Sequence, residues 1–334
     1  MSVLYLAEQG ATLRKHGDTL LVSKNGQDLE EIPASKVGQV VIFGNVNITT
    51  PAIKYLLKNG IDCAFCSSAG KYHGRLFSTE SKFGQLRRSQ YKAVMDENLK
   101  LSMAIQFIKG KFTNQRAFLL RYRRRGQETE VSRAIAALES ALGTVNTVGD
   151  LDSLLGLEGY IGAMYFDTLG SLLKQDLGFT GRVKRPPTDP VNSMLSLGYT
   201  LLVYDAQAAI RTVGLDPFLG FLHSTQYSKP SLALDLIEEF RTIIVDSIVL
   251  RLVNNGVLKR EDFSMQIGFG GMVLLKQEAL RTLIKQYEER MLTEVIHPVS
   301  NIKVNYRRCL ELQARQVARV MTQKQNQYEP FLVR

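Results

Sequence analysis

The first 78 residues alternate between apolar and polar positions in short runs, which is typical of β-strands. Two turn signals, HGD and NG, separate the strand-like runs between residues 12 and 33. The segments VGQVVIFG and GIDCAFCSS predict two further strands. Between them, TTPAIKYLLKNG predicts one short helix, with Thr50 as its N-cap, Pro51 as its first residue and Gly60 as its stop.

From about residue 80, the apolar positions recur every three or four residues, which is the spacing of amphipathic helices. The stretch FGQLRRSQYKAVMDENLKLSMAIQFIKGKFTNQRAFLLRYRRRG keeps this spacing throughout. Six further helices are predicted, over residues 131–143, 150–175, 190–212, 230–254, 272–291 and 303–325. The sequence therefore predicts an α+β protein, in which a small N-terminal β-rich domain, residues 1–78, precedes a larger all-helical C-terminal domain, residues 82–334.

The net charge of the chain indicates which class of binding partner it favours. The 334 residues carry 42 Lys and Arg against 32 Asp and Glu, a net charge of +10, and the pI is about 9.4. This excess favours a polyanion, with nucleic acid ahead of an anionic membrane, although a soluble basic protein is the alternative. No apolar run approaches the roughly 18 residues of a membrane span, and the N-terminus meets charge too early for a secretory signal. Three cysteines fit a reducing compartment, so a cytoplasmic protein is expected.

Cys63 and Cys66 form a CxxC motif that does not indicate a zinc site. A structural zinc ion needs four ligands, and the only nearby addition is His73. Because the segment alternates as a strand does, both cysteines are predicted to be small residues within a sheet.

One carboxylate stands alone in an apolar helix. In LLGLEGYIGAMYF, residues 154–166, Glu158 is the only ionisable side chain apart from tyrosine. An unpaired buried carboxylate costs roughly several kcal/mol unless it is protonated, paired or bound to a metal. Gly156, Gly159 and Gly162 recur at every third position, which permits the close approach of another backbone. A functional site and a structural salt bridge both remain open on this segment alone.

His223 follows the apolar run of residues 217–222 and precedes a helix rich in acids. At about 100° per residue, five polar side chains of that helix fall on one stripe: Asp235, Glu238, Glu239, Thr242 and Asp246. The opposite face is apolar, with Ala233, Ile237, Phe240 and Ile244, so the helix is predicted to be firmly docked. A solvated acidic face is the alternative.

A histidine and carboxylates from separate segments predict a divalent-metal site. Mixed nitrogen and oxygen ligands suit Mn²⁺ or Mg²⁺, and zinc remains an alternative. Three protein ligands would leave positions for water and a phosphate oxygen, an arrangement that supports phosphoryl transfer. A lone histidine in an apolar setting is more often a core residue, so the prediction depends on its combination with Glu158 and the acidic helix.

A third feature, residues 180–202, is a basic loop that leads into a helix. Asp189 is predicted to be the N-cap and Pro190 the first helical residue. Asn192 and Ser193 lie on the first turn, where phosphate oxygens are readily bound. An ordinary capped helix behind a surface loop is the alternative. The basic residues of the loop are Arg182, Lys184 and Arg185.

The densest basic stretch lies between residues 109 and 125 and contains no acid. Such a density, interleaved with aromatic residues, favours contacts to a phosphate backbone without base readout. A solvated charged face is the alternative. The candidates for contact with DNA are Arg87, Arg88, Lys109, Lys111, Arg116, Arg121, Arg123, Arg124 and Arg125, together with Arg182, Lys184 and Arg185.

Four segments occur in the order and rough spacing found in one family. LEGYIGAMYF, RVKRPPTDPVNSMLSLGYTLL, GLDPFLGFLHS and PSLALDLIEEFR together resemble the CRISPR-associated protein 1 family of metal-dependent DNA endonucleases and integrases. The resemblance covers most of the chain, including the β-rich part and the final YRRCLELQARQVARVM. It implies that the chain inserts new spacer DNA into CRISPR arrays by transesterification, in which a DNA 3′-hydroxyl attacks a phosphodiester.

The resemblance also implies residue roles and partners. The three metal ligands of the family fall on Glu158, His223 and Glu238. Helical geometry alone does not choose between Glu238 and Glu239, and the family pattern decides for Glu238. Asp235, Asn192 and Ser224 would be auxiliary polar residues. The expected assembly is a homodimer, joined largely through the β-rich domains, that binds duplex DNA and a dimer of the CRISPR-associated protein 2, with no membrane partner. A general metal-dependent nuclease on branched DNA or RNA and a non-catalytic DNA-binding scaffold are the alternatives.

Overall fold

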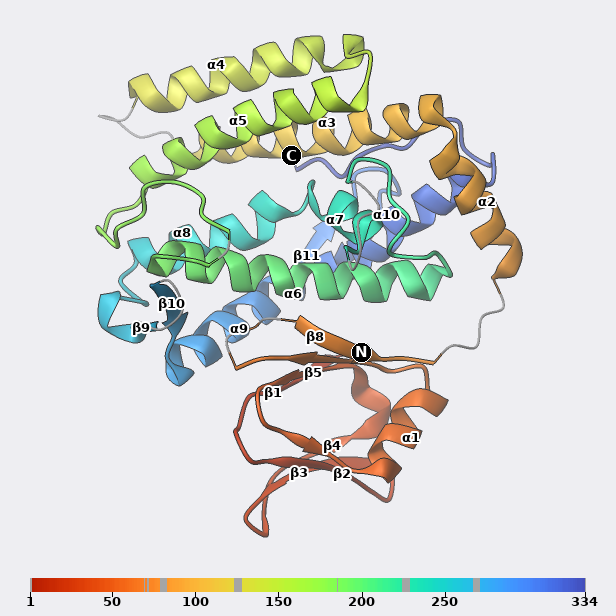
Figure 1. Cartoon of the computed structure of the whole chain (residues 1–334), viewed down its shortest axis with the longest axis vertical. Coiled ribbons are helices and arrows are strands. Elements are labelled where there is room, and N and C mark those ends of the chain that lie inside the picture. The colour runs from red at the N-terminus through yellow and green to blue at the C-terminus, as the bar shows by residue number, and fades with distance from the viewer. Residues whose placement is uncertain are drawn as a thin grey trace. The chain divides into compact units, whose positions relative to one another are not determined.

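The computed structural model describes residues 2–68, 70, 72–78, 83–122, 128–184, 186–223, 229–266 and 271–333 (Figure 1). The chain forms two compact units, Met1–Ser81 and Lys82–Arg334. The first contains two sheets and one helix, and the second is mostly helical, which confirms the α+β class. The second unit is not all-helical as predicted, because it also contains two short β-hairpins.

Two four-stranded sheets form the N-terminal unit. In one, β1 (Ser2–Leu6), β5 (Val37–Phe43) and β7 (Asp62–Cys66) are parallel, and β8 (Tyr72–Leu76) pairs antiparallel with β7. The other has the order β4 (Gln27–Pro33), β3 (Thr19–Lys24), β2 (Thr12–His16) and β6 (Asn47–Ile48). Apolar side chains of both sheets and of helix α1 (Thr50–Lys58) meet in one core.

The turns of this unit follow the sequence signals. The NG turn between β3 and β4 has φ of 51° at Asn25 and 81° at Gly26, which the mirror-image turns of tight hairpins require. Helix α1 begins one residue earlier than predicted, because Thr49 is the last residue with extended backbone and is therefore the N-cap instead of Thr50. Cys63 and Cys66 are buried in β7, as expected of sheet residues, and burial raises the pKa of the Cys63 thiol to about 12.

The helices of the C-terminal unit are α2 (Gly84–Met95), α3 (Glu97–Tyr122), α4 (Glu128–Thr144), α5 (Leu151–Ser171), α6 (Pro190–Val213), α7 (Ser231–Ile237), α8 (Ser247–Asn254), α9 (Gln277–Met291) and α10 (Tyr306–Met321). The long helical stretch after residue 80 is two helices, because Asp96 interrupts it and its carboxylate accepts the backbone N–H groups of Asn98 and Leu99. Helices α3, α4 and α5 lie side by side (Figure 1) and share one apolar cluster. No helix in the described ranges is long and apolar enough to cross a membrane.

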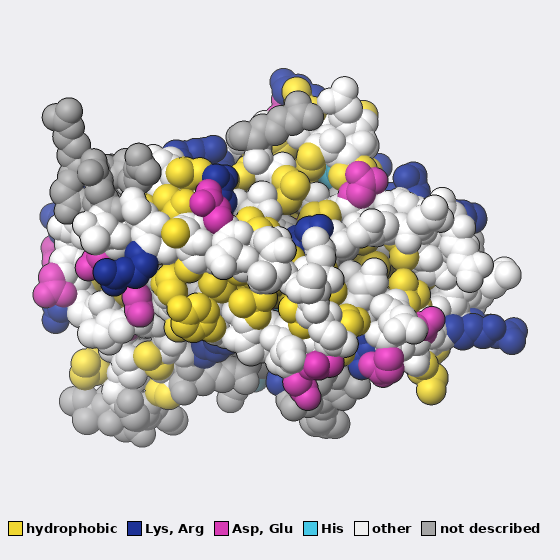
Figure 2. All heavy atoms as spheres, turned by 90° about the horizontal axis from the view of Figure 1, so that it is seen from above, with side chains coloured by type: hydrophobic (Ala, Val, Ile, Leu, Met, Phe, Trp, Pro, Cys, Tyr) yellow, Lys and Arg dark blue, Asp and Glu magenta, His cyan; other side chains and the backbone are white. Residues whose placement is uncertain are grey.

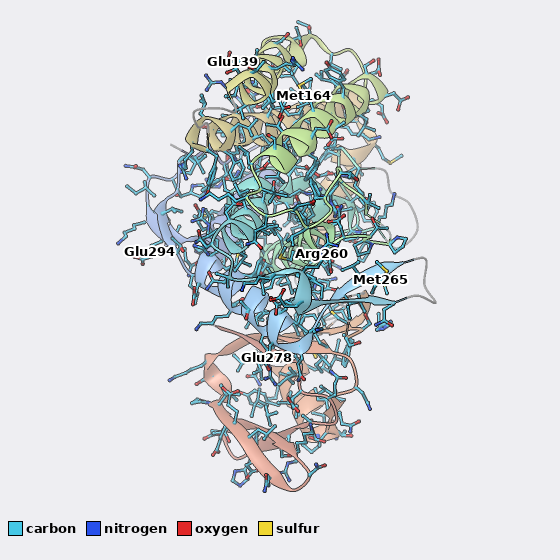
Figure 3. All side chains as sticks on the ribbon, turned by 90° about the vertical axis from the view of Figure 1, so that its left-hand side faces the viewer. Glu139, Met164, Arg260, Met265, Glu278 and Glu294 are labelled. Carbon is cyan, nitrogen blue, oxygen red and sulfur yellow. The ribbon has the colours of Figure 1, made fainter. Side chains whose placement is uncertain are left out.

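Two predicted helices begin later than expected. Residues 272–275 form strand β10 (Met272–Leu275), which pairs with β9 (Phe263–Gln266). Residues 303–305 form β12 (Lys303–Asn305), which pairs with β11 (Glu294–Ile296). The apolar positions of these segments fit helical and strand spacing alike, because too few residues precede each helix start to distinguish the two periods. Figure 3 marks Met265 on the β9–β10 hairpin, where its side chain is exposed.

The predicted helix over residues 230–254 is interrupted. It consists of α7, a turn at residues 238–240, a π-helical turn at Thr242–Asp246 and α8. The π-turn packs closely on α6, because a side chain on Gly198 would have its Cβ 2.5 Å from Val245. A glycine is therefore required at this crossing.

Candidate active site

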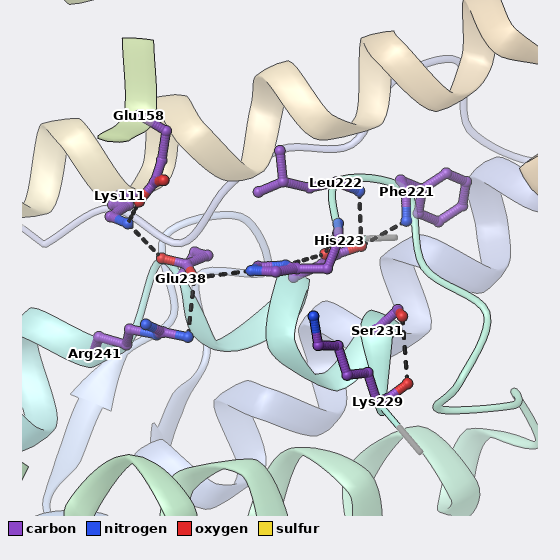
Figure 4. Close-up of polar contacts among 10 residues, drawn as sticks. Lys111, Glu158, Phe221, Leu222, His223, Lys229, Ser231, Glu238 and Arg241 are labelled. Atoms are coloured by element: carbon purple, nitrogen blue, oxygen red, sulfur yellow. Dashed lines mark hydrogen bonds and ion pairs between the residues drawn. The ribbon is translucent and has the colours of Figure 1, made fainter. Parts of the chain in front are cut away.

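Three elements bring the predicted ligands together (Figure 4). Glu158 lies on α5, His223 lies at the end of the segment before α7, and Glu238 directly follows α7. The His223 Nε2 is 3.8 Å from Glu238 Oε1. Glu238 is 3% exposed, whereas the side chains of Glu158 and His223 are 28% and 29% exposed. The cluster is therefore buried on one side and accessible on the other.

The buried carboxylate of Asp235 organises the segment that carries His223. It accepts the backbone N–H groups of Phe221, Leu222 and His223 at 2.6, 3.1 and 2.9 Å. It also lies 2.7 Å from the His223 Nδ1. Because a carboxylate can only accept, Nδ1 carries the hydrogen, and Nε2 is directed to the other side.

Gly220 makes this arrangement possible. A Cβ at this position would lie 2.6 Å from Asp235 Oδ2 and 2.7 Å from the Leu232 nitrogen. Any side chain would therefore push the histidine segment away from α7. The apolar run before His223 thus serves to bring the backbone against a carboxylate.

A lysine ammonium lies between the two glutamates. Lys111, on α3, is 7% exposed, and its Nζ contacts Glu158 Oε1 and lies 2.8 Å from Glu238 Oε2. The prediction that Lys111 contacts DNA from an exposed basic face is wrong, because its stem crosses the interior to reach these carboxylates. Burial alone would lower the pKa of Lys111, but Glu238 and Glu158 outweigh burial and hold it above its usual value.

A second cation, Arg241, lies on the other side of Glu238. Its Nη2 is 3.0 Å from Glu238 Oε1, and its guanidinium lies 5.0 Å from the centroid of the Tyr199 ring. Arg182 stacks on the same ring at 5.4 Å. Burial alone would raise the pKa of Glu238, but Arg241 and Lys111 reverse the effect and lower it to about 2. Arg241 was not among the residues predicted from the sequence, although its position three residues after Glu238 was a usable signal.

The acids that were predicted to lie on one stripe of a helix bond to different partners. Glu239 accepts from Tyr328, Gln313 and the Phe331 backbone, and burial raises its pKa to about 7. Asp246 accepts from Tyr165 at 2.8 Å and from Tyr199. The single-stripe prediction is wrong because the segment is not one regular helix and is buried on every side.

Two of the three glycines around Glu158 face space that no described residue fills. Among the described residues, no atom would lie within 4 Å of a Cβ on Gly156 or Gly159, so the close approach of another backbone does not occur at these two positions. Leu155 and Tyr160, on the same helix, are 38% and 63% exposed. Glu158 therefore borders a smooth, partly apolar surface of α5.

Among the described residues, the hydrogen bonds of Asn192 go to its helix cap and to the basic loop and not to the three predicted ligands. Asp189 caps α6 as predicted, and Pro190 begins the helix. Asn192 is fully buried and bonds to Asp189, to the Gly181 carbonyl and to Arg182. Its amide thus holds the basic loop against the helix and is not available to a phosphate. Ser224 lies outside the described residues.

The remaining basic candidates differ in their surroundings. Arg88, Arg121 and Lys184 are exposed, and the described residues offer them no ionic partner. Burial and the charge of Arg241 lower the pKa of Lys184, whereas Glu158 and Glu238 act in the opposite direction, so its ammonium lies near the cluster. Lys109 is half-buried, and so is Arg87, which donates to the Gly214 carbonyl at 3.4 Å. Arg123, Arg124, Arg125 and Arg185 lie outside the described residues.

Arg116 is paired with an acid. Its Nη2 is 2.6 Å from Glu139 Oε1 on α4, the helix on which Figure 3 marks Glu139. On the face drawn in Figure 2, Lys and Arg side chains are scattered among apolar and uncharged ones, with Asp and Glu close to several of them.

The donor atoms of the cluster bear on whether it can hold a metal. Among the described residues, no three acidic, histidine or cysteine side chains lie close enough to coordinate a cation as they stand. The chemistry of the donor set nevertheless fits a divalent cation: two carboxylates, an imidazole held by Asp235, and a buried Glu238 Oε2 that faces the Lys111 ammonium at 2.8 Å. A cation bound by both glutamates would require the Lys111 ammonium to move.

Comparison with known proteins then decides the family. The family model of the CRISPR associated protein Cas1 matches residues 4–289. This chain belongs to the Cas1 family. It is 37% identical to the CRISPR-associated endonuclease Cas1 3 of Thermus thermophilus, over 100% of this chain and 98% of that protein. It is 35% identical to the CRISPR-associated endonuclease Cas1 2 of Rhodospirillum rubrum, over 99% of this chain and 98% of that protein.

A solved Cas1-containing structure has the same fold. The chain matches a chain of the "Cas6-RT-Cas1--Cas2 complex" with a TM-score of 0.86 and 25% identity, over 99% of this chain and 36% of that chain. The resemblance found in the sequence is thus confirmed, and the chain is an enzyme of a Cas1 endonuclease family.

Proposed function

We propose that this Cas1 protein inserts short duplex DNA into CRISPR arrays by transesterification, with Mn²⁺ or Mg²⁺ held by Glu158, His223 and Glu238. The observation that carries the proposal is the convergence of these three side chains at a partly open cluster surrounded by cations. Phosphoryl transfer requires such a combination, because anionic phosphate must be held while negative charge develops on it.

The chain's own residues would divide the work. Asp235 keeps the His223 ring oriented through Nδ1, so that Nε2 remains available as a ligand. Arg241 is fixed by Glu238 and the Tyr199 ring, and its charge would stabilise the phosphodiester under attack. The attacking 3′-hydroxyl forms the new ester bond while the old phosphodiester bond breaks. A bound divalent cation would polarise the phosphate and activate the nucleophile.

The proposal includes two protein partners. The matched solved structure is a complex that contains a Cas2 component, and a dimer of the CRISPR-associated protein 2 is the partner we propose for this chain. We further propose that two copies of the chain associate through the N-terminal unit. Light scattering of the purified chain, alone and with the small partner, tests both statements, since a monomeric chain would contradict the second.

The function is tested with a supercoiled array plasmid, a short duplex and Mn²⁺, with and without the small partner. Integration should convert the plasmid to a relaxed form carrying the duplex at a repeat boundary. His223→Ala should abolish it, because a nitrogen ligand is lost without removing core volume. Cleavage of plasmid without any joined product would favour a general nuclease instead, and duplex binding without either product would favour a scaffold.

A further inference from the structure

Lys111 occupies the space in which the two glutamates of the candidate metal centre converge. Its Nζ contacts Glu158 Oε1 and lies 2.8 Å from Glu238 Oε2 (Figure 4). The lysine is on α3, whereas the glutamates come from α5 and from the residue after α7. One ammonium therefore joins three separate elements at the point that both carboxylates face.

The two cations beside Glu238 differ in their freedom to move. Arg241 is held through Glu238 Oε1 at 3.0 Å and through the Tyr199 ring at 5.0 Å. Lys111 has no aromatic partner among the described residues, and its ammonium is a compact charge on a flexible four-carbon stem. Of the two, only Lys111 contacts both glutamates, so it is the group that a cation bridging them would displace.

We propose that Lys111 is a tethered competitor of the divalent cation for Glu158 and Glu238. In the metal-free protein, the ammonium neutralises part of the charge of two neighbouring carboxylates and holds them in place. Metal binding then exchanges one cation for another instead of filling a bare anionic site, which weakens the affinity for metal. The inference rests on the proposed metal centre and extends it to the metal-free state.

The test uses the purified full chain without DNA. Mn²⁺ binding is measured by titration calorimetry for the wild type, Lys111→Met, Lys109→Met and His223→Ala. Methionine keeps most of the length of the lysine stem and removes the charge. Lys109 lies on the same helix, two residues away, and has no ionic partner among the described residues, so it is the matched control.

Lys111→Met should bind Mn²⁺ at least tenfold more tightly than the wild type, and Lys109→Met should bind as the wild type does. The metal-free Lys111→Met protein should unfold at a lower temperature, because two carboxylates lose their shared counter-ion. Saturating Mn²⁺ should raise its unfolding temperature more than that of the wild type, since ligand stabilisation grows with affinity.

A second measurement uses only the wild type and decides the question if Lys111→Met does not fold. Amine-reactive labelling followed by mass spectrometry should modify Lys111 slowly without metal, because its side chain is 8% exposed. Saturating Mn²⁺ should accelerate labelling at Lys111 and leave Lys109 unchanged.

The outcomes separate this inference from the proposed function. The competition is overturned if Lys111→Met binds Mn²⁺ equally or more weakly than the wild type, or if Mn²⁺ does not accelerate labelling of Lys111. In either case the proposed metal centre still stands if His223→Ala abolishes Mn²⁺ binding. Absence of Mn²⁺ binding in both the wild type and Lys111→Met overturns the competition and the metal centre together.

Discussion

Replacing Asp235 by asparagine tests whether this carboxylate, rather than a metal ligand, holds the histidine segment. One oxygen accepts the Phe221 and Leu222 N–H groups, and the other accepts the His223 N–H and faces Nδ1. Whichever oxygen becomes an amide NH₂, two donors lose their acceptor. At about 1.5–3 kcal/mol for each hydrogen bond to a charged group, the segment should lose about 3–6 kcal/mol.

Hydrogen exchange read by mass spectrometry is the assay, because it reports the opening of this segment alone. A loss of about 3–6 kcal/mol corresponds to exchange about two to four orders of magnitude faster at residues 221–223. Affinity for Mn²⁺ should fall about 10–100-fold, as for other partners of a metal-bound histidine. Asp246→Asn is the control, since that buried carboxylate bonds to Tyr165 and Tyr199 instead. Exchange within about threefold of the wild-type rate would refute the reasoning.

Three further predictions concern charge. In an integration assay, Glu238→Gln should give no detectable strand transfer, whereas Glu239→Gln should retain it. Glu239→Gln should lose some stability, because Glu239 bonds to the C-terminal segment. The reverse pattern of activity would exchange the roles of the two residues. The double variant Arg88→Gln with Arg121→Gln should weaken binding to duplexes of any sequence and reduce the salt dependence of the affinity by about one counterion per lost phosphate contact. Arg116→Gln should have a smaller effect, because the Arg116 guanidinium is paired with Glu139. Equal effects in binding titrations would contradict this. The pKa of Glu238 is lowered from 4.5 to about 2, so its contribution to stability is present above pH 4.5 and is lost as the pH falls through 2. The free energy of unfolding measured across this range should depend less on pH for Glu238→Gln than for the wild type, and an unchanged profile would contradict the lowered pKa.

Local signals in the sequence predicted most of the fold. Some signals act on the backbone of their own segment, so neighbouring residues alone determine the local structure. Examples are the NG turn, the N-cap Asp189 and the first-turn Pro190. Segments whose structure depends on distant pairing could not be predicted in this way. Residues 272–275 form a strand only because residues 263–266 lie beside them.

The candidate site was predictable in part for the same reason. A carboxylate in an apolar helix and a histidine before acids are unusual within a short window, so Glu158 and His223 could be proposed from these residues. Glu238 was chosen over Glu239 only because the segment resembles the family. Lys111 could not be separated from its basic neighbours, because only its position on α3 directs it inward. Asp235 was one of four acids on the predicted stripe, and its role depends on the backbone of a segment 12 to 14 residues earlier.

The π-helical turn at Thr242–Asp246 has a consequence for how the site tolerates insertions and deletions. A π-turn holds one more residue than an α-turn, so it rotates the chain before it by about 100° relative to the chain after it. The Ile243 carbonyl accepts both Nε and Nη2 of Arg290 from α9, at 2.9 and 2.7 Å. Removing one residue between Arg241 and Asp246 would restore a regular helix and turn Glu238 away from His223, although neither residue had been altered. The turn that sets the rotational phase of Glu238 is thus contacted by a guanidinium more than fifty positions further along the chain.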